Sequence, residues 1–382
     1  MKAIRLEAPG GLDHLRAVDL PDPGKPGPGE VRVRLHASSL NFHDYRVLAT
    51  PGAVAGGRIP MSDGAGVVEA VGADVSAFSP GDHVVSCFFP GWISGEPYLP
   101  DFATVPGDGV DGYAREWVNA PAHCFTHAPK GWSHAEAATI TTAGLTAWRA
   151  LIVNGPLKAG DTVLVLGTGG VSIAALQLAK AMGAIVIATS SSDDKRERLA
   201  AMGASHTINY KTHDDWGRRV KDWTGGRGVD HVIEVGGPAT LPQSIEAVRV
   251  GGHISLIGVL TGRSGDIPTA VLMRKQARLH GLIVGNRVQQ QDYVRALETT
   301  GIRPVIDRSF PLEQIADAFR HEAAGISGRS AWSGEGVLPV RRFATPAAPG
   351  NRARGGPCSA RPPTAWRSGL TARRRHRRPC PS

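Results

Sequence analysis

The fold is decided by the stretch Thr162-Val163-Leu164-Val165-Leu166-Gly167-Thr168-Gly169-Gly170-Val171-Ser172. It opens with an apolar run bounded by turn signals, which is typical of a buried strand. A cluster of glycines follows, and the residues from Ile173 to Met182 have a helical pattern. A strand, a glycine turn and a helix in this order predict the first unit of a parallel sheet.

The same alternation continues along the chain. Helical patterns such as Lys195 to Met202 lie between further apolar runs. The runs that we interpret as buried strands are 184–189, 229–235, 253–259 and 279–284. This alternation predicts an α/β fold with a doubly wound parallel sheet.

The first 125 or so residues have a different pattern. Glu30 to Ala37 alternates polar and apolar side chains, as half-buried strands do, and Pro21 to Gly29 holds four Pro and three Gly. The capping-box pattern Ser133-His134-Ala135-Glu136 then opens the helical part of the chain. A separate, irregular β-rich domain is therefore expected before it.

The charge of the chain is concentrated at its end. The formal net charge is +9, but residues 326–382 contain 12 Arg and one acidic residue, which leaves 31 basic and 33 acidic residues in 1–325. We therefore expect no nucleic-acid surface on the folded body. The tail is rich in Arg and Pro without a period, and we interpret it as disordered.

Membrane and secretion signals are lacking. No apolar stretch approaches the roughly 18 to 20 residues of a membrane span, and the first residues do not form a secretion signal. The four cysteines form no closely spaced set. We expect a cytoplasmic protein without membrane partners, disulfides or a cysteine metal cluster.

The glycine turn predicts a dinucleotide site. Glycines at 167, 169 and 170 permit a tight turn and let the backbone approach a pyrophosphate at the N-terminus of the next helix. Ser172 replaces the last glycine of the usual pattern with another small residue. The predicted cofactor-binding residues here are Gly167, Thr168, Gly169, Gly170 and Val171.

The end of the next strand distinguishes between the two nicotinamide cofactors. The pattern expects an acidic residue about 20 residues on, to bond the ribose hydroxyls. The chain instead offers Ser190 and Ser191, with Lys195 just beyond. Neutral hydroxyls and a lysine suit the 2′-phosphate of NADPH, whereas a carboxylate would repel it. NADPH is therefore predicted. We interpret Asp193 and Asp194 as caps of the following helix.

Several motifs in a fixed order resemble the medium-chain dehydrogenase/reductase superfamily across 1–325. Besides the glycine turn, they are Ser38–Asp44, Asp63–Gly72, Phe78–Val84 and Ala143–Trp148. The resemblance implies a GroES-like catalytic domain over 1–127, a Rossmann domain over 128–287 and a return to the catalytic domain over 288–325. It also implies a homodimer or homotetramer formed through the last Rossmann strand.

Departures from the zinc-dependent branch imply a metal-free enzyme. Asn41 stands where that branch carries a zinc-binding Cys, Ser62-Asp63-Gly64 replaces its Gly-His-Glu, and its four-Cys lobe is missing. Zinc needs at least three protein ligands. No zinc is therefore expected, although Cys87, His43 and Asp63 remain alternative ligands. The chain resembles the quinone oxidoreductase branch.

Residue roles follow from this resemblance. Asn41 would hold the nicotinamide ribose or the substrate oxygen, Asp44 would orient its neighbours, and Tyr45 adjoins them. The alternative for Asn41 and Asp44 is that they only cap turns. The alternative for His43 and Tyr45 is that they are packing residues and not proton donors. The further cofactor contacts that the resemblance implies are Thr146, Gly258, Val259, Asn286 and Arg287.

The predicted function is NADPH-dependent hydride transfer to a quinone, an enone or a related small carbonyl compound. Two alternatives remain, a metal-free alcohol or aldehyde dehydrogenase-like enzyme and a dinucleotide-binding protein with little catalysis. The sequence does not identify the substrate. Family members usually end in a strand resembling His-Phe-Gly-Lys. If residues 326–329 are read one base out of phase, the genetic code permits His-Phe-Gly-Lys or His-Phe-Gly-Gln. Our hypothesis is that a frameshift created the tail; the alternative is a basic arm for nucleic acid.

Overall fold

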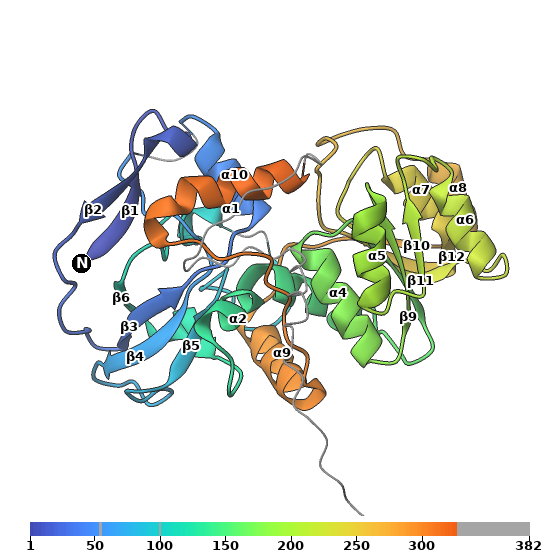
Figure 1. Cartoon of the computed structure of the whole chain (residues 1–382). Coiled ribbons are helices and arrows are strands. Elements are labelled where there is room, and N and C mark those ends of the chain that lie inside the picture. The colour runs from blue at the N-terminus through green and yellow to red at the C-terminus, as the bar shows by residue number, and fades with distance from the viewer. Residues whose placement is uncertain (53–55, 99–100, 327–382) are drawn as a thin grey trace, which may run out of the picture. The chain divides into compact units, whose positions relative to one another are not determined.

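The computed structural model describes residues 1–52, 56–98 and 101–326. Its larger sheet has six parallel strands in the order β10-β9-β8-β11-β12-β13 (Figure 1). The strands are β8 Thr162–Leu166, β9 Ile185–Ser190, β10 His206–Asn209, β11 Val229–Glu234, β12 Val248–Leu256 and β13 Arg278–Gly281. This is the doubly wound Rossmann sheet that the sequence predicts.

Helices cover both faces of this sheet because its strands are apolar on both sides. In β8, Val163 and Val165 belong to one core cluster and Leu164 and Leu166 to another. The first cluster includes residues of α4 and α5, and the second includes residues of α6 and α7. The helices are α4 Gly170–Ala181, α5 Asp193–Ala201, α6 Trp216–Trp223, α7 Leu241–Ala247 and α8 Thr269–Lys275.

The N-terminal part is β-rich. Its main sheet has five antiparallel strands in the order β6-β3-β4-β5-β7, and β1 pairs with β2 in a second, two-stranded sheet. The strands are β1 Lys2–Leu6, β2 Leu15–Asp19, β3 Glu30–Ala37, β4 Ala65–Val71, β5 His83–Ser86, β6 Trp117–Pro121 and β7 Phe125–His127. Helix α1 Phe42–Ala49 follows β3; it carries Asp44 and Tyr45, and Asn41 is its N-cap.

A helical segment connects the two sheets. The capping box at Ser133 is present, with the hydroxyl accepting from the Glu136 N–H, and it opens α2 His134–Ala138. Two π-helical turns, Ile140–Gly144 and Arg149–Val153, flank α3 Leu145–Trp148. Such turns are rare and are frequently found at functional sites.

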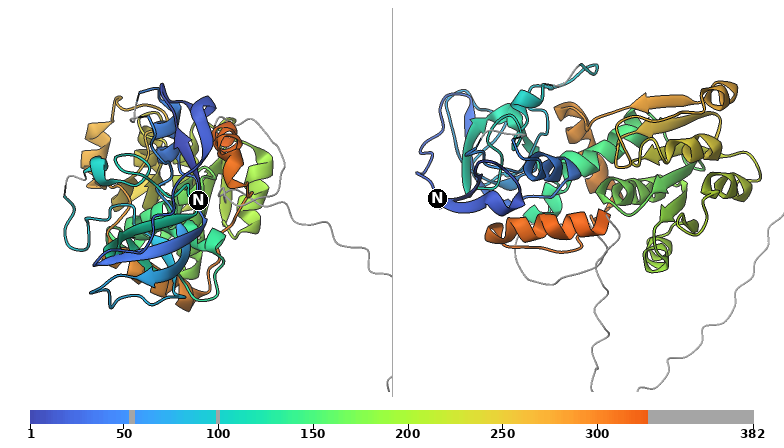
Figure 2. Two further views of the ribbon diagram at one scale, coloured as in Figure 1. Left: turned by 90° about the vertical axis from the view of Figure 1, so that its left-hand side faces the viewer. Right: turned by 90° about the horizontal axis from the view of Figure 1, so that it is seen from above.

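The described chain ends on the N-terminal part. After α9 Arg287–Thr300, helix α10 Ile315–Ile326 packs beside the N-terminal strands in both views of Figure 2. Its fully buried Phe319 shares a core with Ile4, Leu48 and Phe310. The segment over 288–325 therefore contributes apolar contacts to the domain where the chain begins.

Several element boundaries differ from the sequence prediction. Helix α4 begins at Gly170, so the turn itself is only 167–169, because helical hydrogen bonding starts as soon as the turn is complete. Asp193 and Asp194 lie in the first turn of α5, whose N-cap is Ser192, so their interpretation as caps was wrong. The tail that we predict to be disordered lies, from residue 327 on, outside the described residues.

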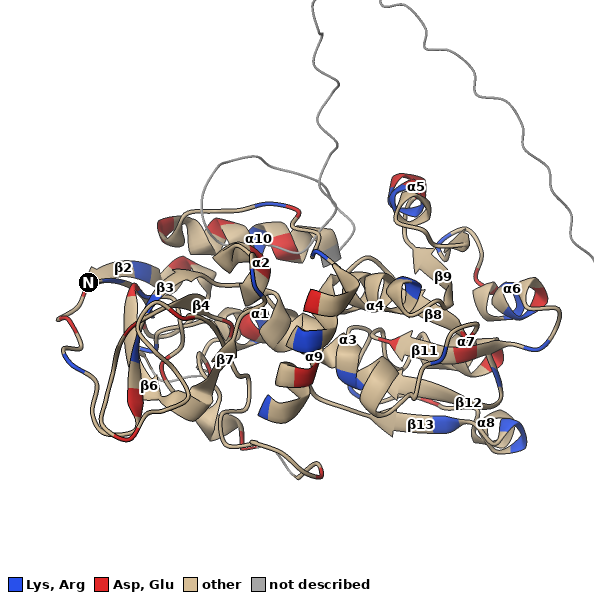
Figure 3. Cartoon of the chain, turned by 90° about the horizontal axis from the view of Figure 1, so that it is seen from below, with Lys and Arg blue, Asp and Glu red and all other residues tan. Residues whose placement is uncertain are grey.

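Charges on the described residues are mixed. Figure 3 shows Lys and Arg interspersed with Asp and Glu on most helices. Many of these charges form short-range ion pairs, such as Arg219 with Asp215 at 2.7 Å. Among the described helices, none is long and apolar enough to cross a membrane.

We predict that Phe319→Ala lowers the free energy of unfolding by about 3–5 kcal/mol, because it leaves a cavity between α10 and the N-terminal core. Urea denaturation measures the change. Met273→Ala is the control, since Met273 is 70% exposed and its truncation is expected to cost less than about 0.5 kcal/mol. Equal effects of the two substitutions would contradict this packing.

Candidate active site

Asn41 is the centre of a buried polar cluster. It occupies the N-cap position of α1, yet its side chain makes no capping hydrogen bond. Its amide nitrogen Nδ2 instead lies 2.9 Å from Asp63 Oδ2, 3.1 Å from Asp44 Oδ2 and 3.3 Å from the Ser39 carbonyl oxygen. The contacts of the Asn41 side chain therefore favour a role in this polar cluster over a role as a cap.

The two carboxylates of this cluster are almost inaccessible, with Asp44 3% and Asp63 0% exposed. Asp44 accepts hydrogen bonds from the Ser62 N–H at 2.9 Å and from the Ser62 hydroxyl at 3.2 Å. Burial raises the pKa of Asp44, although these hydrogen bonds oppose the rise. Asp44 thus joins α1 to the segment before β4, which fits the orienting role predicted for it.

The other face of Asp63 meets the helical segment. The Thr142 hydroxyl donates to Asp63 Oδ1 at 2.6 Å, and the Thr146 hydroxyl donates to the Thr142 carbonyl at 2.7 Å. Thr146 is therefore one helical turn from Thr142, and its place near the nicotinamide stays a prediction. We define the Asn41 cluster as Asn41, Asp44, Ser62, Asp63 and Thr142.

Tyr45 is not part of the Asn41 cluster. Its ring stacks on Phe42 with the centroids 6.0 Å apart and packs against the core that includes Phe319. The structure therefore gives Tyr45 a packing environment, which was the alternative reading of this residue.

The glycine turn lies between β8 and α4, where the pyrophosphate is predicted to bind. Gly167 has a φ of +72°, and a side chain there or at Gly169 would meet no atom within 4 Å. The space above the turn is therefore open. The Ser172 hydroxyl donates to the Leu166 carbonyl at 2.7 Å, so this small residue ties α4 closely to β8. Thr168 lies in the turn, and Gly170 and Val171 form the first turn of α4.

The end of β9 lies beside this turn. Gly167 N–H donates to the Thr189 carbonyl at 3.0 Å. Ser190 is 1% exposed, and its hydroxyl has no partner within the part of the chain that the structure describes. Ser191 follows directly, and Lys195 lies in the first half of α5. The Ser190 hydroxyl is therefore buried at the carboxyl end of β9 without a hydrogen bond to the described residues.

One residue of this region escaped the sequence analysis. Tyr210 directly follows β10, its N–H donates to the Ser190 carbonyl at 3.0 Å, and its side chain is 42% exposed. Strand β10 has only four residues, of which Ile208 alone is apolar, so it shows no pattern typical of a strand. Recognising this strand would have placed Tyr210 at the same sheet edge as Ser190.

Two predicted cofactor residues have other contacts. Arg287 Nε donates to the Phe125 carbonyl in β7 at 3.0 Å, and Asn286 caps α9 by accepting from the Gln289 N–H at 2.8 Å. No contact in the described part of the chain brings Arg287 to the glycine turn. Gly258 and Val259, by contrast, follow the carboxyl end of β12, as expected for residues that contact the cofactor.

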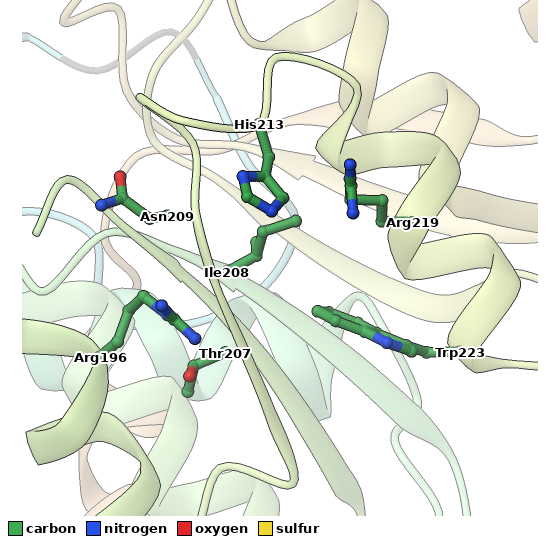
Figure 4. Close-up of a pocket in the computed structure, with 7 residues that line it drawn as sticks. All are labelled: Arg196, Thr207, Ile208, Asn209, His213, Arg219 and Trp223. Carbon is green, nitrogen blue, oxygen red and sulfur yellow. The ribbon is translucent and has the colours of Figure 1, made fainter. Parts of the chain in front are cut away.

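A small pocket near the edge of the parallel sheet is a different site. It has a volume of about 120 Å³ and lies among α5, β10 and α6 (Figure 4). Its two arginines, Arg196 and Arg219, are already paired with Asp193 and Asp215 at 2.8 and 2.7 Å. We do not assign the cofactor to this pocket, because a dinucleotide requires a larger site, of about 300 Å³ or more.

The donor set does not fit a zinc ion. Within the described ranges, no three His, Cys, Asp or Glu side chains are grouped so that they could hold a metal. Of the alternative ligands, Cys87 is buried, with its sulfur 3.9 Å from Gln290 Nε2. Asp63 is bonded to Asn41 and Thr142 instead.

Comparison with known proteins agrees with this architecture. Residues 27–130 match the alcohol dehydrogenase GroES-like domain, and residues 170–300 match the zinc-binding dehydrogenase family. The zinc-type alcohol dehydrogenase-like protein C1773.06c of Schizosaccharomyces pombe is 41% identical over 322 residues, covering 82% of this chain and 92% of that protein. The quinone oxidoreductase of Pongo abelii is 30% identical over 279 residues, covering 71% and 78%.

Solved structures give the same result. A putative alcohol dehydrogenase from Sinorhizobium meliloti 1021 is 40% identical with a TM-score of 0.80, covering 89% of this chain and 99% of that chain. A structure of crotonyl-CoA carboxylase/reductase AntE in complex with NADP is 26% identical with a TM-score of 0.74, covering 90% and 95%.

These findings define a NAD(P)-dependent oxidoreductase with a GroES-like domain and a Rossmann domain. The chain belongs to the medium-chain dehydrogenase/reductase superfamily.

We predict that Asp44→Asn destabilises the GroES-like domain by about 1–3 kcal/mol, because the new amide group faces the donors of Ser62 and Asn41 and leaves hydrogen bonds unmade. Thermal denaturation measures the loss. Asp19→Asn is the matched control, because Asp19 is exposed on β2. A loss no larger than that of the control would show that the Asp44 contacts do not hold the cluster.

Proposed function

We propose that the protein uses NADPH, without zinc, to reduce the carbon–carbon double bond of an enone or quinone. The observation that carries this proposal is the Asn41 cluster. An amide stands at its centre, and both hydrogens of this amide face buried carboxylates and a carbonyl. Such a centre can orient ligands by hydrogen bonds but offers no set of metal ligands.

The orientation of the Asn41 amide limits its role. Because Nδ2 faces acceptors, only the carbonyl oxygen Oδ1 is left to contact a ligand, and this atom accepts hydrogen bonds. It suits a hydroxyl donor, such as one of the nicotinamide ribose. It does not suit the oxygen of a substrate carbonyl, which also accepts. Of the two roles predicted for Asn41, we propose ribose binding.

The bound nicotinamide would supply the hydride. The chain would hold the dinucleotide at the open glycine turn and at the carboxyl ends of β9 and β12, where Ser190, Ser191, Gly258 and Val259 lie. Thr146 and the Asn41 cluster would fix the nicotinamide ribose. The protein then acts by holding the donor carbon in register with the substrate, a contribution that positioning can make large.

Two features support NADPH over NADH. The neutral residues Ser191 and Ser192 follow β9, and Lys195 lies in the first half of α5. Of the two acidic residues that open α5, Asp193 is already paired with Arg196 at 2.8 Å. A cation and neutral hydroxyls suit a 2′-phosphate, which a carboxylate would repel. A relative of the same fold was solved with NADP.

A second candidate function is alcohol or aldehyde oxidoreduction without a metal. It is supported by the similarity to the alcohol dehydrogenase of Sinorhizobium meliloti. The two functions differ in the carbon that receives the hydride. Binding of NADPH without turnover of any carbonyl compound would instead favour the little-catalysis alternative.

We also propose a homodimer or homotetramer that assembles through β13. This strand lies at the edge of the parallel sheet, and Met273 and Ile283, close to it in sequence, are 70% and 45% exposed. An exposed edge strand is open to pairing with another chain.

The two described cysteines are free and buried, which fits the cytoplasmic location that we propose.

We predict that the purified protein binds NADPH more tightly than NADH and contains no stoichiometric zinc. Titration by nucleotide fluorescence and metal analysis of the same sample measure both. Lys195→Ala should weaken NADPH binding by about tenfold or more, since a charge-assisted hydrogen bond contributes about 1.5–3 kcal/mol. Binding of NADH should not change.

Lys180→Ala on the exposed side of α4 is the control, and it should alter neither affinity. Tighter binding of NADH would contradict the cofactor assignment, and one zinc per chain would contradict the metal-free assignment.

A further inference from the structure

His43 lies between Asn41 and Asp44 in the first turn of α1 and has an environment of its own. Its Nε2 is 3.4 Å from Asp108 Oδ2. Its ring meets Phe88 edge-on at 5.2 Å and lies 5.7 Å from the ring of Phe102. The side chain is 25% exposed, but its Nε2, which faces Asp108, is buried and makes no hydrogen bond to the described residues, so Nδ1 is the ring nitrogen left to meet a ligand.

The loop that carries Asp108 is tightly folded. Asp108 N–H and Val110 N–H both donate to the Val105 carbonyl at 3.2 Å, and Gly107 N–H donates to the Val110 carbonyl at 2.8 Å. A side chain at Gly109 would lie 2.1 Å from the backbone carbon of Ala103. The turn is therefore close-packed, and it fixes the carboxylate that faces His43.

Three carboxylates interact electrostatically with the imidazole. Asp44 lies on the same helix, Asp63 on the segment before β4, and Asp108 on the turn. Burial of the ring lowers the pKa of His43, but these three carboxylates raise it, and the net shift is upward. The proton is therefore retained to a higher pH than on an ordinary histidine.

The Asn41 cluster leaves one catalytic need unmet. Hydride transfer to an enone or quinone leaves negative charge on the substrate, which must receive a proton or a hydrogen bond from a donor. The Asn41 amide hydrogens are committed to the carboxylates, and Thr142 donates to Asp63. His43 is a neighbouring side chain that can carry a donated proton.

We propose that His43 is the general acid of the reaction and that Asp108 positions it; this inference rests on the proposed function. The aromatic rings of Phe88 and Phe102 beside it favour a planar, apolar substrate. As hydride bonds to the carbon β to the carbonyl, the double-bond electrons move toward the oxygen. Imidazolium of His43 gives its proton to the resulting enolate or quinol oxygen, or to the α-carbon, and is reprotonated by water. Oxidation of NADPH balances reduction of the substrate.

Two variants test the role of His43. His43→Gln should lower kcat for a cyclic enone or a benzoquinone by about 100-fold, the usual size of general acid catalysis. NADPH affinity should stay unchanged. His43→Ala should recover part of its activity when imidazole is added, which a merely structural role would not allow.

Asp108→Asn tests the positioning role. The raised pKa of His43 means that activity is present at low pH and falls as the pH rises through that pKa. Loss of the carboxylate lowers this pKa, so the alkaline limb of the kcat profile should move to lower pH. The matched control is Asp307→Asn. It removes the carboxylate from another histidine–aspartate pair, in which Asp307 Oδ2 lies 2.8 Å from Nε2 of His321 in α10. This substitution should leave the kcat profile unchanged.

NMR titration of the His43 ring in the wild-type and Asp108→Asn proteins separates this inference from the proposed function. A pKa above that of ordinary histidines that falls in the variant supports the pair whatever the substrate. A pKa that does not respond overturns the pairing. Full activity of His43→Gln in an enzyme that reduces enones overturns the role of His43 alone, whereas a wild type that binds NADPH but reduces none overturns both.

Discussion

The burial of Asp44 and Asp63 around one asparagine amide is the constraint on which the rest of the site depends. Two carboxylates removed from water cost much free energy unless donors surround them. Ser62, Thr142 and Asn41 provide these donors. Because the donors come from α1, the segment before β4 and the π-helical turn at 140–144, the same contacts hold these three elements in one arrangement.

The Asn41 cluster also differs in charge from a cluster with a thiolate at position 41. A thiolate at position 41 would place a third negative charge beside Asp44 and Asp63, and a cation would be needed to balance it. An amide donates to both carboxylates and makes the cluster self-sufficient. The chemistry then depends on the cofactor and on groups next to the cluster, of which His43 with Asp108 is the one that we propose.

The sequence predicted the Rossmann sheet well because its signals are local. The apolar run of β8, the glycine turn and the capping box at Ser133 each lie within a few residues, and each is present in the structure. Strand β10 and Tyr210 were missed because four residues are too few to show a period. The charge-complementarity argument for NADPH rests on neighbours in sequence and stays a prediction.

The candidate site was harder to predict because its contacts join distant residues. Nothing in the sequence around Asn41 indicates that Thr142, about a hundred residues away, donates to Asp63, or that Asp108 faces His43. The environment of Tyr45 could not be predicted for the same reason, since α10 packs on it from the end of the described chain. Spacing gives neighbours on one element, whereas tertiary packing decides which face of the element meets the site.

The carbon that receives the hydride is identified by reducing a cyclic enone with NADPH that carries deuterium at both C4 positions of the nicotinamide. We expect deuterium at the carbon β to the carbonyl in a saturated ketone, formed by protein without bound zinc. Deuterium on the carbinol carbon of an unsaturated alcohol would contradict this expectation and would show that the enzyme reduces the carbonyl group instead.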